Sequence, residues 1–433
     1  MKFRKTASSI IILQLFLTNF ISLFNPVFSS DDYISEEPPW TKFWEGNIGS
    51  VNNMASVNSI ATDQFNKIYI LRDIFDSKNL SYDYFLTKLN NSGSLEWEVP
   101  LNYNGIAWDG YQKIKIDAYN DIYLLGTFTI LGIPYLNITL LKYDPIGNQI
   151  WNKTLKDSEG QKSYDMDSDS LGNLYLVGFK ENSRLVKLNN SGSILWNHTW
   201  GENKSYEYTA ITIDSNDYIY VTGFNNYNSI LIKFNSTGYC EWNYTWKAYY
   251  KHDLTLDFNG NILVASGNKL LKLNPNGFSL WNFTLPSNSV NTPGLSIDSL
   301  NNIYIAENRE IPCYDNTLFG GCGWASAIYL EKVNSSGDFM WEKRCTGCVF
   351  ASCSDIAIDS VGNIYLSGYV LFELGSMKPL SDAILMKNPK TFEGLCIPIY
   401  YNLIILITVL LALNVLIVVS VFLIRYKRKK KKV

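Results

Sequence analysis

Residues 356–368 read Ile-Ala-Ile-Asp-Ser-Val-Gly-Asn-Ile-Tyr-Leu-Ser-Gly, and this stretch decides the fold. Two β-branched or aromatic runs flank an Asp/Ser/Gly/Asn turn, which predicts a tight β-hairpin. The same arrangement, an aspartate with an apolar residue six positions later, recurs seven times. The pairs are Asp63/Tyr69, Asp117/Tyr123, Asp169/Tyr175, Asp214/Tyr220, Asp257/Leu263, Asp298/Tyr304 and Asp359/Tyr365. The body of the chain is therefore a set of seven repeats.

A second motif alternates with this hairpin and predicts an outer strand in each repeat. One copy, at 185–196, reads Leu-Val-Lys-Leu-Asn-Asn-Ser-Gly-Ser-Ile-Leu-Trp. In six copies a glycine stands four residues before a tryptophan, at Gly93/Trp97, Gly147/Trp151, Gly192/Trp196, Gly238/Trp242, Gly277/Trp281 and Gly337/Trp341. Each repeat thus contains four short strands, and the aspartates recur every 41 to 61 residues. That spacing is typical of a β-propeller blade, with a solenoid as the alternative.

The two ends of the repeat region favour a closed ring. The last copy ends at 383–387 without its outer strand, while Trp44 stands alone before the first aspartate. Trp44 precedes Asp63 by 19 residues, and the other six tryptophans precede the next aspartate by 15 to 20. We therefore predict an all-β, seven-bladed propeller whose N-terminal outer strand completes the last blade and leaves no sheet edge at the seam.

These repeats resemble a known family. The run Asp-Ala-Ile-Leu-Met-Lys (382–387), the Lys-Leu-Asn-Asn-Ser-Gly-Ser turns and the Ile-Asp-Ser-x-Gly-Asn-Ile-Tyr-Leu-x-Gly hairpins are similar to the SBBP beta-propeller repeat. The tryptophan strands also resemble pyrroloquinoline-quinone-type repeats, which share the propeller fold. The resemblance implies an exported prokaryotic, and more specifically archaeal, surface protein, but no single activity. The last blade departs from the pattern, because Lys-Asn-Pro-Lys (387–390) replaces the usual turn.

Both ends of the chain have the pattern of membrane-targeting segments. A basic start and an apolar run over 10–24 predict a signal peptide at 1–29, with an uncleaved anchor as the alternative. The 22 residues from Leu403 to Ile424 are almost all Leu, Ile and Val, enough to cross a bilayer. We expect a linker at 30–39, the propeller at 40–394, a transmembrane helix at 397–424 and a basic cytoplasmic tail at 425–433.

Charge segregation narrows the class of partner. The net charge of the chain is -3, but its two ends carry ten of the 37 basic residues and no acid. The remaining 27 basic residues face 40 acids, so the body is near -13. An acidic body argues against nucleic acid as a partner, because phosphate binding needs basic patches.

The repeated residues are the first candidates for chemistry. A ring of seven aspartates could hold Ca²⁺, but a turn acceptor explains every one of them. The tryptophans Trp44, Trp97, Trp151, Trp196, Trp242, Trp281 and Trp341 are better explained by packing between blades than by ligand stacking. His198 and His252 are isolated, and no His-Glu-x-x-His, phosphate loop or Gly-x-Ser-x-Gly occurs. We therefore expect no catalytic residue, no metal and no cofactor.

Cysteines and sequons provide further candidate sites. Five cysteines cluster at Cys313, Cys322, Cys345, Cys348 and Cys353, on two loops predicted to meet at one face. Disulfides are the default outside the cell, with a zinc or iron–sulfur site as the alternative. Eleven sequons predict glycans on an exported protein, at Asn79, Asn90, Asn137, Asn152, Asn189, Asn197, Asn203, Asn235, Asn243, Asn282 and Asn334.

A complete scaffold without a catalytic constellation favours a binding function. We expect a single-pass cell-membrane protein whose external propeller binds a protein or glycan, as an adhesin or envelope scaffold. The loops around 72–84, 127–137 and 306–327 are the expected binding face, because loops on a rigid scaffold carry recognition. The alternatives are a surface propeller enzyme, either quinone-dependent or a glycan hydrolase, and a purely structural envelope component.

Overall fold

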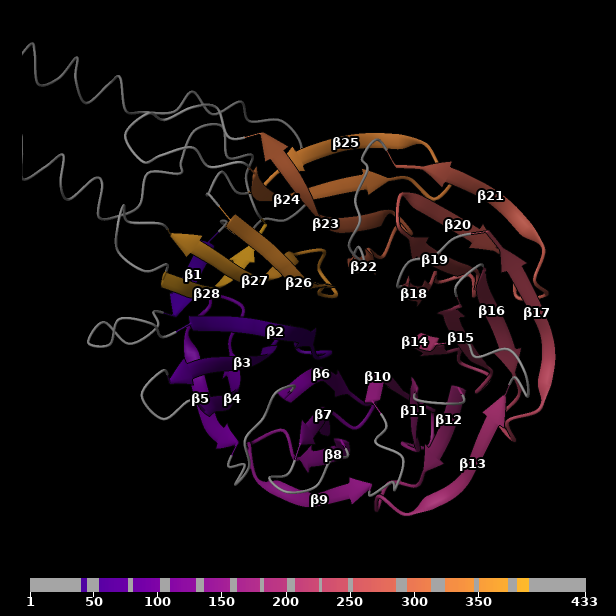
Figure 1. The fold of residues 1–433 in the computed structure, drawn as a ribbon, viewed down its shortest axis with the longest axis horizontal. Coiled ribbons are helices and arrows are strands. Elements are labelled where there is room, and N and C mark those ends of the chain that lie inside the picture. Colours follow the sequence, from indigo (N-terminus) through magenta and orange to yellow (C-terminus); the bar gives the residue numbers. More distant parts are fainter. Residues whose placement is uncertain are drawn as a thin grey trace, which may run out of the picture. The chain divides into compact units, whose positions relative to one another are not determined.

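A computed structural model describes 14 segments of the chain. These are residues 40–44, 54–76, 81–101, 110–129, 136–155, 162–179, 183–200, 207–225, 228–247, 252–285, 294–312, 324–345, 350–372 and 380–388. They contain 28 β-strands and, within these ranges, no helix. Consecutive strands pair in antiparallel fashion in groups of four, and the groups follow one another around a ring (Figure 1). The described residues therefore form the seven-bladed propeller that the repeats predict.

The first four blades follow the chain without a break. Blade 1 comprises β2 (Met54–Thr62), β3 (Ile68–Asp76), β4 (Ser81–Leu89) and β5 (Leu95–Leu101). Blade 2 comprises β6 (Gly110–Ile116), β7 (Ile122–Thr129), β8 (Leu136–Tyr143) and β9 (Gln149–Leu155). Blade 3 comprises β10 (Lys162–Ser168), β11 (Leu174–Phe179), β12 (Ser183–Leu188) and β13 (Ile194–Trp200). Blade 4 comprises β14 (Glu207–Ile213), β15 (Ile219–Phe224), β16 (Ser229–Phe234) and β17 (Cys240–Trp246).

The remaining blades include the one that closes the ring. Blade 5 comprises β18 (His252–Leu256), β19 (Ile262–Ser266), β20 (Lys269–Leu273) and β21 (Ser279–Thr284). Blade 6 comprises β22 (Gly294–Ile297), β23 (Ile303–Pro312), β24 (Trp324–Val333) and β25 (Phe339–Arg344). Blade 7 comprises β26 (Phe350–Ile358), β27 (Ile364–Phe372) and β28 (Leu380–Lys387), completed by β1 (Trp40–Trp44) from the other end of the chain.

The repeated aspartate closes the first hairpin of every blade. In blade 7, Asp359 Oδ1 accepts hydrogen bonds from the backbone of Val361 (3.2 Å) and Asn363 (2.8 Å), and Oδ2 accepts one from the Tyr365 hydroxyl (3.0 Å). The turn also needs a residue with positive φ, which is Gly362 here (φ 87°). Glycine, asparagine and aspartate tolerate that conformation best, which explains the Asp-x-x-Gly/Asn spacing.

Gly368, the last residue of the hairpin motif at 356–368, is required for a different reason. A Cβ built on Gly368 would lie 1.9 Å from the carbonyl oxygen of Ser352 on the neighbouring strand β26. The pairing of β26 with β27 shifts register nearby, between Cys353 and Asp355, as in a β-bulge. Only glycine permits this close approach of the two backbones, so Leu-x-Gly marks the bulged end of the hairpin.

The tryptophan of each outer strand contacts the next blade. Trp242 donates its indole N–H to the carbonyl of Pro275, 3.2 Å away, and Lys233 donates to the same oxygen at 3.1 Å. A Cβ on Gly277 would lie 3.0 Å from the Trp242 ring, so this turn rests on the indole. The same pattern links Lys272 and Trp281 to Ser335. The Gly-x-x-x-Trp spacing therefore encodes packing between blades.

Apolar side chains fill the spaces between blades. One cluster joins Leu231 of blade 4 to Leu254, Ile262 and Val264 of blade 5, and another joins Leu263 of blade 5 to blade 6. A further cluster packs blade 1 against Tyr365 and Leu385 of blade 7, across the seam. Each sheet therefore buries both of its faces against its neighbours, as a propeller requires.

Ring closure by the N-terminal strand is confirmed, with a corrected register. Strand β1 pairs with β28, and Trp40 lies opposite Lys387 while Trp44 lies opposite Ala383. In the other blades the repeat tryptophan lies opposite the equivalent lysine, as in Lys88/Trp97 and Lys332/Trp341. Trp40, not Trp44, therefore holds the repeat position. Spacing to the next aspartate was a poor guide because linkers between blades vary in length.

Several expectations lie outside the described residues. These are the signal peptide at 1–29, the linker at 30–39, the membrane helix at 397–424 and the tail at 425–433. Within the described ranges, no helix has the length and apolar character to span a bilayer.

Candidate functional site

The two ends of the ring differ in construction. One end, which we call the turn face, consists of the seven Asp turns (63–67, 117–121, 169–173, 214–218, 257–261, 298–302 and 359–363) and six outer turns (90–94, 144–148, 189–193, 235–239, 274–278 and 334–338). All thirteen have the same backbone hydrogen-bond pattern. The opposite end, the loop face, carries the connections between second and third strands and those between blades. Its hairpins vary from five-residue strands in blade 5 to ten-residue strands in blade 6.

The seven aspartates are used by their own turns. Six are only 4–7% exposed, and their carboxylates accept backbone and tyrosine hydrogen bonds. Leu263 replaces the tyrosine in blade 5, where Asp257 Oδ2 instead pairs with Lys272 Nζ at 2.9 Å. Among the described residues, no group of three or more His, Cys, Asp and Glu side chains is arranged to hold a metal ion. The geometry thus gives the aspartates a structural role.

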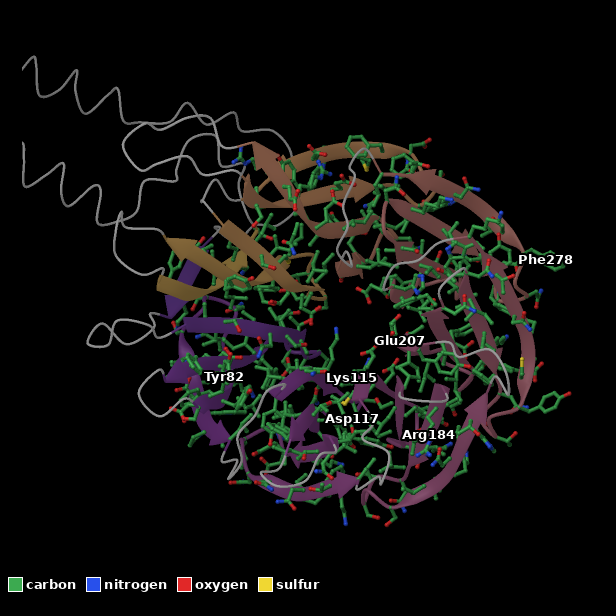
Figure 2. All side chains as sticks on the ribbon, in the orientation of Figure 1. Tyr82, Lys115, Asp117, Arg184, Glu207 and Phe278 are labelled. Carbon is green, nitrogen blue, oxygen red and sulfur yellow. The ribbon has the colours of Figure 1, made fainter. Side chains whose placement is uncertain are left out.

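Charged side chains gather around the axis of the ring. They stand four residues before the turn aspartate, at Lys113, Asp165, Asp253 and Asp355 in blades 2, 3, 5 and 7. Lys113 Nζ lies 3.8 Å from Asp355 Oδ2. Two residues further along β6, Lys115 Nζ lies 2.5 Å from Asp167 Oδ1. The side chains of Lys113 and Lys115 remain 33% and 37% exposed, so solvent reaches the axis. Figure 2 shows Lys115 beside the middle of the ring.

These axial aspartates connect adjacent blades. Asp165 Oδ2 accepts from the backbone N–H of Ile211 at 2.9 Å, and Asp253 Oδ2 accepts from Leu295 at 2.7 Å. The first strand of a blade has no sheet partner on its inner side, so these carboxylates satisfy edge N–H groups of the next blade. Burial raises the pKa of Asp165 to about 7 and that of Asp253 to about 6, opposed by Lys113. Sequence reasoning missed this cluster, whose signal is the charge at a fixed offset from the turn.

One Ser–His contact is present but lacks the features of a catalytic pair. His252 Nε2 lies 2.8 Å from Ser229 Oγ, at the junction of blades 4 and 5. Both residues are buried, His252 Nδ1 has no partner among the described residues, and burial lowers the pKa of His252 to about 3. A general base needs an orienting group and access to substrate, which this pair does not have. His198 lies elsewhere, against Thr237.

Part of the cysteine prediction needs correction. Cys345 and Cys353 both pack in the core between blades 6 and 7, and both are free thiols rather than disulfide partners. Burial raises the pKa of Cys345 to about 12, so the thiol stays protonated and unreactive. Cys345 directly follows β25 and Cys353 lies on β26, so both are in the core instead of on a loop between the blades. Cys313, Cys322 and Cys348 lie outside the described residues.

The sequons fall into three structural groups. Asn90, Asn189, Asn235 and Asn334 begin outer turns on the turn face, and Asn152, Asn197, Asn243 and Asn282 follow the tryptophans on the outer strands. Asn137 on β8 is only 5% exposed, and its amide nitrogen is buried, so the folded chain leaves no room for a glycan there. Asn79 and Asn203 lie outside the described residues.

The loop face of blade 1 carries an aromatic platform. The rings of Phe75 and Tyr82 lie 4.9 Å apart at the tip of the β3–β4 hairpin, and Tyr82 stacks on Tyr84 at 6.0 Å. Tyr84 continues to Tyr111 (5.4 Å), which leads to Phe128 in blade 2. Tyr82 remains 38% exposed, whereas Tyr84, Tyr111 and Phe128 are buried. The platform thus consists of the exposed Tyr82 ring (labelled in Figure 2) and the half-buried Phe75 ring, on a buried aromatic base.

A polar network adjoins this platform. Asp73 accepts hydrogen bonds from Ser56 Oγ (2.8 Å) and Asn58 Nδ2 (3.0 Å). Burial raises the pKa of Asp73, and burial, followed by the charge of Asp73, raises the pKa of Tyr82. Sequence reasoning placed the 72–84 loop on the binding face but did not single out Phe75 and Tyr82. The available signal was Tyr-x-Tyr at 82–84, since alternate strand residues share a face.

Blade 6 holds a second charged group near the loop face. Arg309 pairs with Glu307, Glu331 and, at 2.6 Å, Glu342, and its guanidinium stacks on Tyr329. Glu331 and Glu342 lie directly opposite each other on β24 and β25. Burial, together with the charge of Glu307, raises the pKa of Glu331 to about 8. One arginine therefore faces three carboxyl groups, an arrangement that favours a proton on Glu331.

Comparisons with known proteins add a structural likeness of low similarity. No family model matches the chain, and no curated protein matches it. Among solved structures, the chain is similar to a protein of unknown function from Bacteroides caccae, with 15% sequence identity and a TM-score of 0.40. The match covers 68% of this chain and 94% of that one.

Proposed function

We propose that the chain is a membrane-anchored extracellular binding protein of the SBBP-type repeat family, and not an enzyme, that recognises a glycan or protein with its loop face. The observation that carries this proposal is the contact of the half-buried Phe75 ring with the exposed Tyr82 ring, at 4.9 Å, beside the Asp73 network. Aromatic faces stack on the apolar faces of sugars, and carboxylates accept hydrogen bonds from their hydroxyls. This arrangement favours a carbohydrate ligand.

The positions of the first and last strands of the propeller support a loop face that points away from the membrane. Trp40 begins β1 and Lys387 ends β28 at the turn face, where Asn388 bonds the backbone of Ile364 beside the Asp359 turn. A span at 397–424 would therefore hold the ring by its turn face. The loop face would then point away from the membrane, toward partners outside the cell.

Binding by the full chain in vesicles to labelled cell-envelope polysaccharide tests this function. We expect saturable binding that Phe75→Ser with Tyr82→Ser weakens by about tenfold or more, because stacking aromatics dominate such sites. Tyr239→Ser is the matched control, since Tyr239 is 69% exposed but lies on the turn face. Equal binding by the double variant and wild type would exclude the platform, and polysaccharide hydrolysis by the wild type would favour an enzyme.

A further inference from the structure

The turn face carries a ring of exposed apolar side chains that the fold does not use. In five blades the second residue after the turn aspartate is large and apolar, and in blade 5 the first residue is. We call these six residues the apolar crown: Phe65, Tyr119, Leu171, Phe258, Leu300 and Val361. They are 56–73% exposed. Scattered apolar residues on a surface are ordinary, but repetition at one place in successive turns is not.

Hydrogen bonds between neighbouring turns place the crown residues side by side around the face. Ser170 donates to Asp217 of the next blade through its backbone N–H (3.0 Å) and its hydroxyl (3.1 Å). Phe258 N donates to Asn301 at 2.8 Å, and Ser360 Oγ donates to Asn66 at 2.8 Å across the seam. Hydrogen bonds thus join neighbouring turns at three junctions, between blades 3 and 4, 5 and 6, and 7 and 1, and hold the crown residues of these turns at one level.

The electrostatics of the turn face suit an apolar environment. Six of the seven turn aspartates are buried, so their carboxylates are not presented to the surface. The backbone N–H groups of these turns are bonded within the turns, as at Asp63, where Oδ1 accepts from Phe65 and Lys67. Crown side chains can therefore enter a less polar medium without carrying unsatisfied turn donors with them.

The route of the chain identifies what covers this face. The last strand ends at the turn face, and Asn388 is hydrogen-bonded to the Asp359 turn. Only eight residues, 389–396, separate Asn388 from the predicted membrane helix at 397. Fully extended, they reach at most about 30 Å. Tyr400 and Tyr401 follow in the sequence, and tyrosine is enriched at membrane–water interfaces.

We propose that the turn face rests on the outer surface of the lipid bilayer, with the apolar crown in the headgroup region. This inference rests on the membrane anchor of the proposed function, and it adds a second, peripheral contact to the single span. Apolar and aromatic side chains gain free energy at this depth, and the short tether keeps them at high local concentration. The contact would hold the ring flat on the membrane and direct the loop face outward.

Hydroxyl-radical footprinting of the full chain in phosphatidylcholine vesicles tests the proposal residue by residue. We expect the crown residues to be oxidised several-fold more slowly in vesicles than after proteolytic release by cleavage within 389–396. Tyr82 is the internal control, because it is 38% exposed and lies on the opposite, loop face. Its oxidation should be the same before and after release.

The outcomes separate this proposal from the anchor itself. A chain that washes off the vesicles in carbonate contradicts the proposed anchor. An anchored chain whose crown is oxidised equally before and after release overturns the bilayer contact alone. A crown that stays protected after release indicates a second copy or a protein partner instead. Glycans on Asn90, Asn189, Asn235 or Asn334, read from the same peptides, would hold the face off the membrane and also count against it.

Discussion

At the residue scale, one side chain type explains most of the repeat. Each turn aspartate accepts from two backbone N–H groups, and in six blades also from a buried tyrosine hydroxyl, so three donors depend on one carboxylate. The spacing of six residues is the spacing at which the tyrosine on the second strand returns to the turn. A ring of aspartates could have indicated calcium from sequence alone, and the hydrogen bonds show the structural use.

Replacing Asp117 by alanine tests this role. The change removes the acceptor for Tyr119 N, Asp121 N and the buried Tyr123 hydroxyl, and should lower the free energy of unfolding by about 2–4 kcal/mol. Asp144→Ala is the control, because Asp144 closes the same kind of turn at an accessible outer position and should cost about 1 kcal/mol. Thermal and denaturant unfolding measure both, and equal losses would contradict a special role for the inner turn.

At the element scale, the β23–β24 hairpin of blade 6 should respond to pH. Burial raises the pKa of Glu331 to about 8, whereas the carboxyl group of an unfolded chain titrates near 4.5. The folded state therefore binds more protons between these values, and stability falls as pH rises from about 4.5 to about 8. Glu331→Gln keeps the neutral shape, so its unfolding temperature should decline less across this range than that of the wild type.

A matched substitution isolates the cause of that slope. Glu241→Gln removes a carboxyl group from the exposed outer strand of blade 4 and should leave the pH profile unchanged. Circular dichroism melts at pH 5 and pH 8 suffice for the comparison. If Glu331→Gln and the wild type lose the same stability over this interval, the carboxyl group with the raised pKa is not that of Glu331. The carboxyl groups of Glu307 and Glu342 would then be the next positions to substitute, since both pair with Arg309.

The elements also show what sequence can predict in such a protein. Hairpins and outer strands were predictable because their turns repeat Asp, Asn and Gly at fixed offsets, a local signal. The axial charges, the Phe75–Tyr82 platform and the Arg309 cluster break the repeat, and their partners come from other strands or blades. The candidate site lies in these departures from the repeat, so a repeat pattern predicts the scaffold better than the candidate site. The prediction that Cys345 and Cys353 lie on a loop between blades 6 and 7 was also wrong, since both pack in the core.

At the scale of the whole molecule, closure of the propeller ring depends on the five residues of β1, Trp40–Trp44. Strand β1 supplies the outer strand of blade 7, and its removal would expose the edge of β28, whose other side pairs with β27. In the other six blades a turn joins the third strand to the outer strand, whereas β28 and β1 are held together by backbone pairing and packing. The seam should therefore be the weakest part of the ring.

Deleting residues 40–44 should lower the unfolding temperature by about 10 °C, because an entire strand of backbone pairing and its packing are lost. The exposed edge should also pair with other chains, so association that increases with protein concentration should appear in sedimentation. Phe43→Ser is the control, since Phe43 is 42% exposed and its substitution leaves the β1–β28 backbone pairing intact. A deletion variant that stays monomeric and melts with the control would show that the ring does not need its terminal strand.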